Sequence, residues 1–92
     1  MDRDKVNRWL AAVIDVLDEI GEAPEGAIYA GLTEDGMTIN EWEIVKGILL
    51  HGRLARNASQ NVLVLTEAGK VMAERIREFQ RERNELYRNA SR

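Results

Sequence analysis

The sequence predicts a mainly helical α+β domain, and three local patterns support this prediction. Apolar residues recur at helical spacing over residues 4–20. A Thr-x-x-Glu motif at Thr38 is typical of a helix start in the middle of the chain. A β-favouring run over residues 62–65 follows a polar segment. We therefore expect three N-terminal helices, a two-stranded β-hairpin and a long C-terminal helix.

The first two helices are predicted from apolar spacing, glycine and proline. Residues 4–20 place their apolar side chains on one side, as in a long amphipathic helix, and Gly21 suits the end of that helix. A short second helix is expected to begin at Pro24, because proline has no N–H to lose in a first turn, and to reach about Leu32. Residues 33–36 are typical of a turn.

The third helix has the clearest start signal in the chain. The Thr38 hydroxyl and the Glu41 carboxylate can each accept a hydrogen bond from one free backbone N–H, an arrangement known as a capping box. Met37 and Trp42 stand at the positions of a hydrophobic staple around this cap. We expect the helix to stop at Gly52.

The second half of the chain predicts a hairpin followed by a helix. Residues 53–56 and 62–65 flank the polar segment 57–61, which is expected to form the tip of the hairpin. Thr66 suits the cap of a last helix that runs to about Arg88.

Length and composition indicate one domain, residues 1–92, with residues 80–92 as a C-terminal helical extension. The 92 residues are 45% hydrophobic and 32% charged, which is enough for a modest core. The chain has no cysteine, which excludes disulfides and thiolate zinc sites. No apolar run approaches the roughly 20 residues that span a membrane, and the start is charged, so we expect a soluble, cytoplasmic protein.

The net charge of −3 hides a division between the two halves of the chain. Residues 1–45 carry 3 basic and 11 acidic groups, whereas residues 46–92 carry 10 basic and 5 acidic groups. No acidic residue lies between Glu43 and Glu67, and three basic residues occupy that interval. A charge asymmetry of this kind indicates a charged working face.

The two segments that flank the predicted hairpin resemble a known fold. They are Gly52-Arg53-Leu54-Ala55-Arg56 before it and Leu63-Val64-Leu65-Thr66-Glu67-Ala68-Gly69-Lys70 after it. With the element order, they resemble a winged helix-turn-helix domain over residues 4 to about 80. The Leu-Thr-x-x-Gly run is similar to that of MarR-like and PadR-like regulators and of small winged-helix proteins of the YjcQ type.

This resemblance implies a DNA-binding transcriptional regulator. Its third helix would lie in the major groove, and its hairpin, or wing, would contact the backbone. A helical wheel places Ile39, Trp42, Val45, Ile48 and Leu49 inward. The expected DNA-contacting residues face outward on this helix or lie on the wing: Asn40, Glu43, Lys46, Gly47, His51, Arg53, Arg56, Asn57, Ser59, Gln60 and Asn61. Asparagine can read adenine, glutamate can accept from cytosine, and glycine permits close approach.

A second interpretation stays open, in which the same face is an ordinary solvated surface and the domain binds protein. Glu34, Asp35, Glu41 and Glu43 cluster where the domain would meet DNA, and like charge repels. The isoelectric point of about 5.2 is below the values typical of DNA-binding domains. The alternative is therefore a non-catalytic interaction module whose acidic N-terminal half docks a protein partner.

The last helix predicts a homodimer contact. Met72, Ile76, Phe79, Arg83, Leu86 and Tyr87 keep to one side of it, with Arg83 in an otherwise apolar seam. Either this seam packs onto the first helix alone, or its part beyond residue 80 meets a second copy. We favour the homodimer, which would present two third helices to a palindromic site.

No pattern in the sequence predicts catalysis. His51 is the sole histidine and has no partners at the spacing of a metal site or a proton relay. Glycine-rich phosphate loops and serine elbows are also missing from the sequence. We therefore expect neither an enzyme nor a cofactor or metal.

Overall fold

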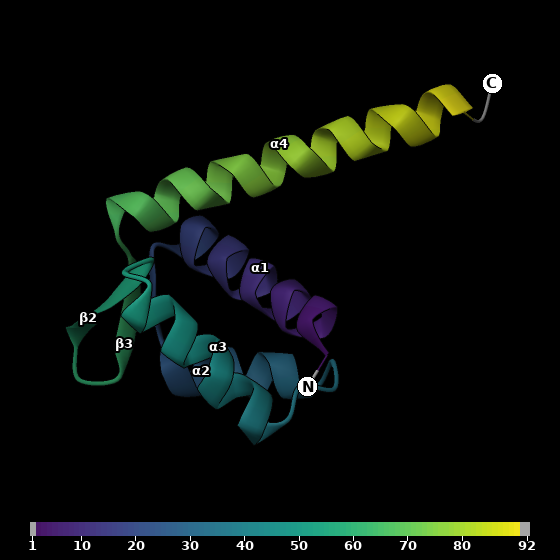
Figure 1. Cartoon of the computed structure of the whole chain (residues 1–92). Helices are drawn as coiled ribbons and strands as arrows, with labels where there is room; N and C mark the ends of the chain where they lie inside the picture. The colour runs from purple at the N-terminus through teal and green to yellow at the C-terminus, as the bar shows by residue number, and fades with distance from the viewer. Residues whose placement is uncertain (1, 91–92) are drawn as a thin grey trace.

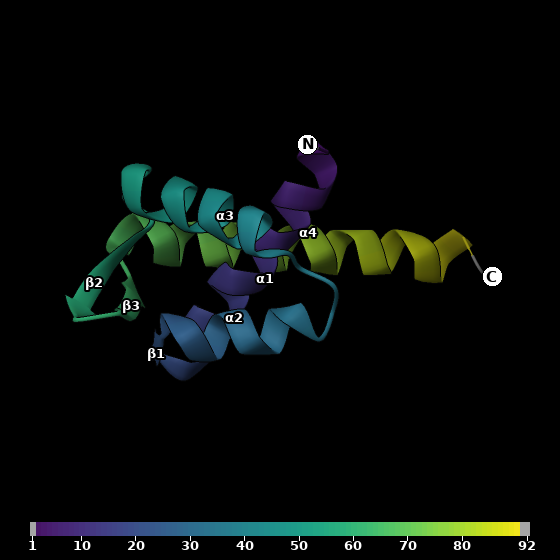
Figure 2. The same ribbon diagram turned by 90° about the horizontal axis from the view of Figure 1, so that it is seen from below.

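The computed structural model describes residues 2–90, which form four helices and a small antiparallel sheet (Figure 1). The elements follow one another as α1 (Arg3–Ile20), β1 (Glu22–Pro24), α2 (Glu25–Thr33), α3 (Ile39–His51), β2 (Ala55–Ser59), β3 (Val62–Leu65) and α4 (Glu67–Ala90). Seen from below, α2 and α3 lie on either side of α1 (Figure 2). The mainly helical α+β class is confirmed.

Helix α1 forms as the apolar spacing predicts. The Asp2 side chain accepts a hydrogen bond from the backbone N–H of Asp4 and caps the helix. Gly21 ends it with φ of 89°, a conformation that favours glycine. The buried side chains of α1 include Val13 and Leu17, which lie in the middle of the core.

Strand β1 is a correction to the predicted second helix, which does not begin at Pro24. Residues 22–24 pair with β3 instead, with Glu22 opposite Val64 and Pro24 opposite Val62, and α2 begins one residue later. The sheet therefore has three strands in the order β1-β3-β2, not two. Proline is tolerated here because β1 is an edge strand and needs no N–H on its outer side.

Helix α3 begins at the predicted capping box. The Thr38 hydroxyl accepts from the N–H of Glu41 at 3.2 Å, and the Glu41 carboxylate accepts from the N–H of Thr38 at 2.8 Å. Met37 and Trp42 are both buried beside this cap. The helix ends at His51, with Gly52 as its C-cap, as expected.

The hairpin is shifted relative to the prediction. Strand β2 begins at Ala55 and continues to Ser59, so the tip shrinks from five residues to Gln60 and Asn61. The pairing of β2 with β3 is irregular between Asn57 and Ser59. The sequence pattern ends this strand at residue 56, but the structure continues it through the polar residues 57–59, with a bulge-like irregularity in the pairing.

The Leu-Thr-x-x-Gly run has a structural explanation where α4 begins. The Thr66 hydroxyl donates to the carbonyl of Arg53 at 2.5 Å and accepts from the N–H of Gly69 at 3.1 Å. A Cβ atom on Gly69 would lie 1.9 Å from the carbonyl oxygen of Leu54. Thr66 therefore caps α4 as predicted, and Gly69 lets the helix approach the start of the hairpin.

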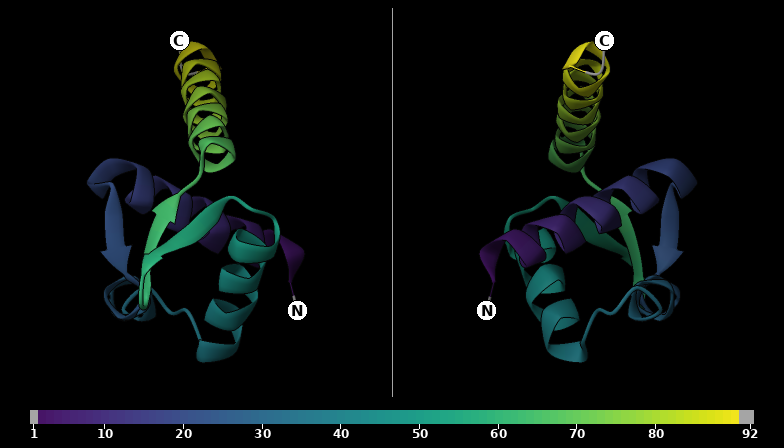
Figure 3. Two further views of the ribbon diagram at one scale, coloured as in Figure 1. Left: turned by 90° about the vertical axis from the view of Figure 1, so that its left-hand side faces the viewer. Right: turned by 90° about the vertical axis from the view of Figure 1, so that its right-hand side faces the viewer.

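Helix α4 packs on α1 through its first half and then extends beyond the core. Ala73 is buried, and Met72 and Ile76 are half-buried against the core. An ion pair joins Arg77 to Asp18 of α1. Beyond it the helix continues to Ala90 on the outer side of α1, away from α2 and α3 (Figure 3). Over the described residues, no helix has the length and apolar character to cross a membrane.

Candidate functional site

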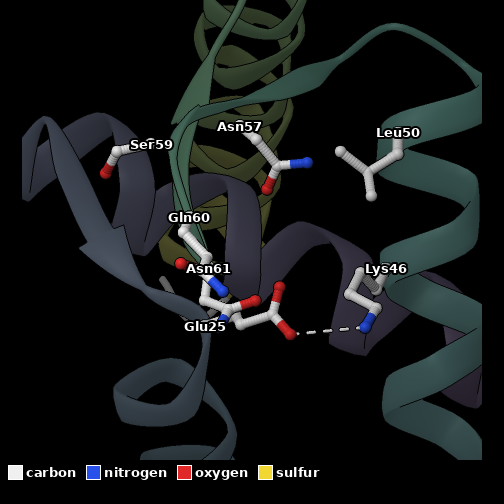
Figure 4. A pocket seen from close by; sticks show the side chains of 7 residues that line it. All are labelled: Glu25, Lys46, Leu50, Asn57, Ser59, Gln60 and Asn61. Atoms are coloured by element: carbon white, nitrogen blue, oxygen red, sulfur yellow. Dashed lines mark hydrogen bonds and ion pairs between the residues drawn. The ribbon is translucent and has the colours of Figure 1, made fainter.

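The candidate site comprises the outward face of α3 and the β2–β3 hairpin. A hollow of about 470 Å³ separates them (Figure 4). Its lining comes from three elements: Glu25 of α2, Lys46 and Leu50 of α3, and the hairpin residues Asn57, Ser59, Gln60 and Asn61. In the close-up, Asn57 and Leu50 lie on opposite sides of this hollow. The structure thus brings Lys46 together with the four polar hairpin residues that the sequence predicts.

Four other predicted residues share the outward face of α3. Asn40, Glu43 and His51 are exposed, and Gly47 lies between them along the helix. A Cβ atom on Gly47 would have only the His51 ring near it, at 4.0 Å. This part of α3 therefore offers a shallow, mainly polar surface to a partner.

Lys46 is not the unpaired cation that the sequence suggested. Its ammonium group lies 3.3 Å from the Glu25 carboxylate and 3.6 Å from the Glu43 carboxylate, and its side chain is only 23% exposed. The interval between Glu43 and Glu67 lacks acids in the sequence, but Glu25 reaches it from α2. Two carboxylates therefore offset the positive charge of Lys46.

Arg53 and Arg56 remain as the cations at the base of the hairpin. Both are exposed, and within residues 2–90 neither has a carboxylate within ion-pair distance. Arg53 occupies the turn after α3 with φ of 57°, and Arg56 lies in β2 opposite Val64. Within the candidate site, the positive charge that no described carboxylate offsets therefore lies at the base of the hairpin.

The inward face predicted for α3 is too wide. Trp42, Val45 and Leu49 are buried as expected, but Ile39 and Ile48 are exposed. The helix wheel placed them inward because they are apolar, whereas the core contacts only a narrow stripe of α3. Ile44, which the prediction omitted, is exposed too. The candidate site therefore carries apolar side chains among its polar ones.

The acidic residues near α3 differ in their surroundings. Glu41 is only 5% exposed and pairs with Lys5 of α1 at 3.2 Å. The hydrogen bond from the Thr38 backbone, with help from Lys5, lowers the pKa of Glu41 below its usual 4.5, against the effect of burial. Glu34 and Asp35 are exposed in the turn before α3. Glu41 and Glu43 each form an ion pair, with Lys5 and Lys46, whereas within the described residues Glu34 and Asp35 form none.

The predicted dimer residues on α4 divide into two groups. Met72 and Ile76 pack against the core of their own chain. Phe79 and Leu86 are 66% and 70% exposed, and Tyr87 is also exposed. The Arg83 guanidinium lies over the Tyr87 ring, 5.8 Å from its centre.

Among residues 2–90 there is no cluster of three or more His, Cys, Asp or Glu side chains that could hold a metal ion. His51 is exposed at the end of α3.

No family model, no curated protein and no solved structure matches the chain.

Proposed function

We propose that the chain is a winged helix-turn-helix protein that binds double-stranded DNA and acts in the cytoplasm as a homodimeric transcriptional regulator. The supporting observation is the order α1-β1-α2-α3-β2-β3-α4, in which a helix with one exposed face leads into a hairpin whose two arginines have no carboxylate partner among residues 2–90. In this proposal α3 enters the major groove, and the β2–β3 hairpin is the wing.

The outward face of α3 supplies groups suited to base edges. Asn40 lies in the first turn, and Glu43, Gly47 and His51 follow at steps of three and four residues along one face. Asparagine can bond adenine through two hydrogen bonds, and glutamate can accept from cytosine. Gly47 lowers the surface between them and permits close approach to the duplex.

The wing supplies the phosphate contacts. Arg53 and Arg56 are exposed cations, and the tip adds neutral donors from Asn57, Gln60 and Asn61. With two such arginines in each copy, both without an ion pair in the described part of the chain, a dimer would neutralise about four phosphates. The logarithm of the binding constant should then fall with the logarithm of salt concentration with a slope of about −3.6.

A salt titration of duplex binding tests this proposal. Fluorescence anisotropy with a pool of random-sequence duplexes should give measurable binding at low salt and the slope above. Arg56→Ala should weaken binding to every sequence and make the slope less steep, by about 1 for each arginine lost. Arg81→Ala is the matched control, because Arg81 is an exposed arginine on α4. It should leave the binding constant and the salt slope unchanged. Failure to bind any duplex at low salt would contradict the proposal.

A second candidate function is a protein-interaction module that does not bind DNA. It is favoured by the exposed Ile39, Ile44 and Ile48 on α3 and by the neutralised Lys46. Apolar groups near acidic residues suit a basic partner with apolar side chains. Reversing the charges of Glu34 and Asp35 to lysine should then abolish capture of such a partner. For DNA binding, the same reversals should strengthen the complex.

A further inference from the structure

Within the residues that the structure describes, the C-terminal half of α4 buries no side chain. The last contacts with the core are those of Ile76 and the Arg77–Asp18 ion pair. Residues 78–90 continue for about 20 Å at the usual helical rise. This segment exposes Phe79 and Leu86, and a neighbour is needed to remove this apolar surface from water.

A groove of about 360 Å³ lies beside this segment, where α1 and α4 diverge. Figure 1 shows the N-terminal half of α1 moving away from α4. Ala11, Ile76 and Phe79 give the groove its apolar lining. Three arginines, Arg8, Arg75 and Arg83, also line it, and within residues 2–90 none of them pairs with a carboxylate. A suitable occupant must therefore carry both apolar and acidic side chains.

We propose that the occupant is the C-terminal half of α4 from a second copy of the chain, in an antiparallel arrangement. The segment is neutral as a whole, with three glutamates and three arginines, but Glu82 lies between Phe79 and Leu86 along the helix. The face that carries these two apolar side chains therefore also offers a carboxylate to the arginines of the groove. A two-fold axis makes the exchange reciprocal, so each copy fills the groove of the other. The inference rests on the homodimer in the proposed function and specifies its geometry.

The arginine in the seam decides the direction of the two helices. In an antiparallel pair with Phe79 opposite the partner's Leu86, Arg83 lies beside the partner's Glu82. In a parallel pair, Arg83 meets the partner's Arg83, and like charges repel. Parallel pairing also places the partner's Leu86 beyond the end of the groove. Charge and apolar matching therefore both favour the antiparallel pair.

Engineered cysteines test this geometry directly, because the chain has none of its own. Residues 79 and 86 are about 10.5 Å apart along one helix, too far for a disulfide within a chain. Phe79→Cys/Leu86→Cys should therefore oxidise to a covalent dimer, whereas each single variant should remain uncrosslinked. A dimer crosslinked by Phe79→Cys alone would indicate parallel helices and overturn the proposal.

Light scattering over a concentration series provides the second measurement. The unmodified chain should have twice the mass of one chain, and Phe79→Ser should raise the dimer dissociation constant about 30-fold or more. Val71→Ser is the matched control, because Val71 is exposed on the same helix but lies outside the groove. Circular dichroism should show both variants folded. A monomeric unmodified chain, or a Phe79→Ser variant that dimerises normally, would overturn the proposal.

These readouts separate the dimer geometry from DNA binding. A dimer crosslinked as expected that binds no duplex would support this geometry and contradict only the proposed function. A monomer that binds a duplex would overturn this geometry alone.

Discussion

At the scale of single residues, Gly69 is the glycine with the least space for a side chain. The missing side chain lets α4 pass within contact distance of the Leu54 carbonyl, where a Cβ atom would meet oxygen at 1.9 Å. Beside it, the Thr66 hydroxyl donates to the Arg53 carbonyl and accepts from the Gly69 N–H, which holds the start of the hairpin against the start of α4. The turn after α3 and the cap of α4 are thus one structural unit.

Gly69→Ala should therefore lower the free energy of unfolding by about 2–3 kcal/mol, because the backbone at Leu54 must shift to admit the methyl group. Urea unfolding measures this loss. Gly31→Ala is the matched control, since Gly31 lies within α2 with open space around its Cβ position. It should stabilise the protein by about 0.5–1 kcal/mol through helix propensity. Equal effects at the two positions would contradict this account of Gly69.

Glu41 gives the domain a pH-dependent component of stability. Its pKa is lower in the folded state, chiefly because its carboxylate accepts the Thr38 N–H. A depressed pKa contributes stability that is fully present above the usual value of 4.5 and is lost as pH falls through the folded value. Glutamine at this position keeps an acceptor for the cap but cannot titrate.

We therefore expect the unmodified chain to be more stable than Glu41→Gln at about pH 6, and the difference to shrink toward about pH 3. Denaturant unfolding of both proteins across this range measures it. Contributions from the other carboxyl groups cancel in the comparison. A difference that stays constant with pH would show that the pKa of Glu41 is not depressed.

At the scale of elements, the junction of α2, α3 and the hairpin controls the charge of the candidate site. Lys46 belongs to α3, but the carboxylate of Glu25, at the start of α2, lies 3.3 Å from its ammonium group. The interval that looks wholly basic in the sequence is therefore partly neutralised in the fold. A residue of α2 thus lowers the net positive charge of the candidate site.

Removing this carboxylate should release the lysine in part, because the Glu43 carboxylate stays 3.6 Å from its ammonium group. In the proposed complex, Glu25→Gln should therefore strengthen duplex binding and steepen the salt slope by up to about 1 for each lysine. Anisotropy titrations at several salt concentrations measure both. Glu22→Gln is the control, because Glu22 is exposed in β1 and does not line the hollow. An unchanged slope for Glu25→Gln would show that Lys46 takes no part in binding.

The elements also show what the sequence could and could not predict. The capping box at Thr38 and the cap at Thr66 are local interactions, so their motifs located two helix starts correctly. Strand β1 has only three residues, too few for a periodic pattern, and it exists because β3 lies beside it. The Glu25–Lys46 pair joins residues 21 positions apart. Local signals thus predicted the helices, whereas the third strand and the charge of the site depend on tertiary contacts.

At the scale of the whole molecule, the basic residues of the second half of the chain lie in two separate places, on α4 and around the hairpin. Much of the positive charge of the second half lies on α4, on the opposite side of α1 from α2 and α3 (Figure 3). In the candidate site, Lys46 is paired with Glu25 and Glu43, so Arg53 and Arg56 are the cations there that have no carboxylate partner among residues 2–90. The elongated shape, 50 × 28 × 20 Å, arises from the same helix. The two proposals, DNA binding and dimer assembly, therefore concern different ends of the fold.

This separation predicts that the domain can lose its assembly segment and keep its fold. A chain that ends after Gln80 retains every buried core residue, because the last of them is Ala73 and the last partly buried one is Ile76. Its circular dichroism should show a folded domain. The unfolding temperature of the full chain should rise with protein concentration, as mass action requires for a dimer. That of the shortened chain should not change with concentration. A concentration dependence that survives the truncation would place the dimer contact elsewhere, whereas loss of the fold would show that residues 81–90 contribute to the stability of the single chain.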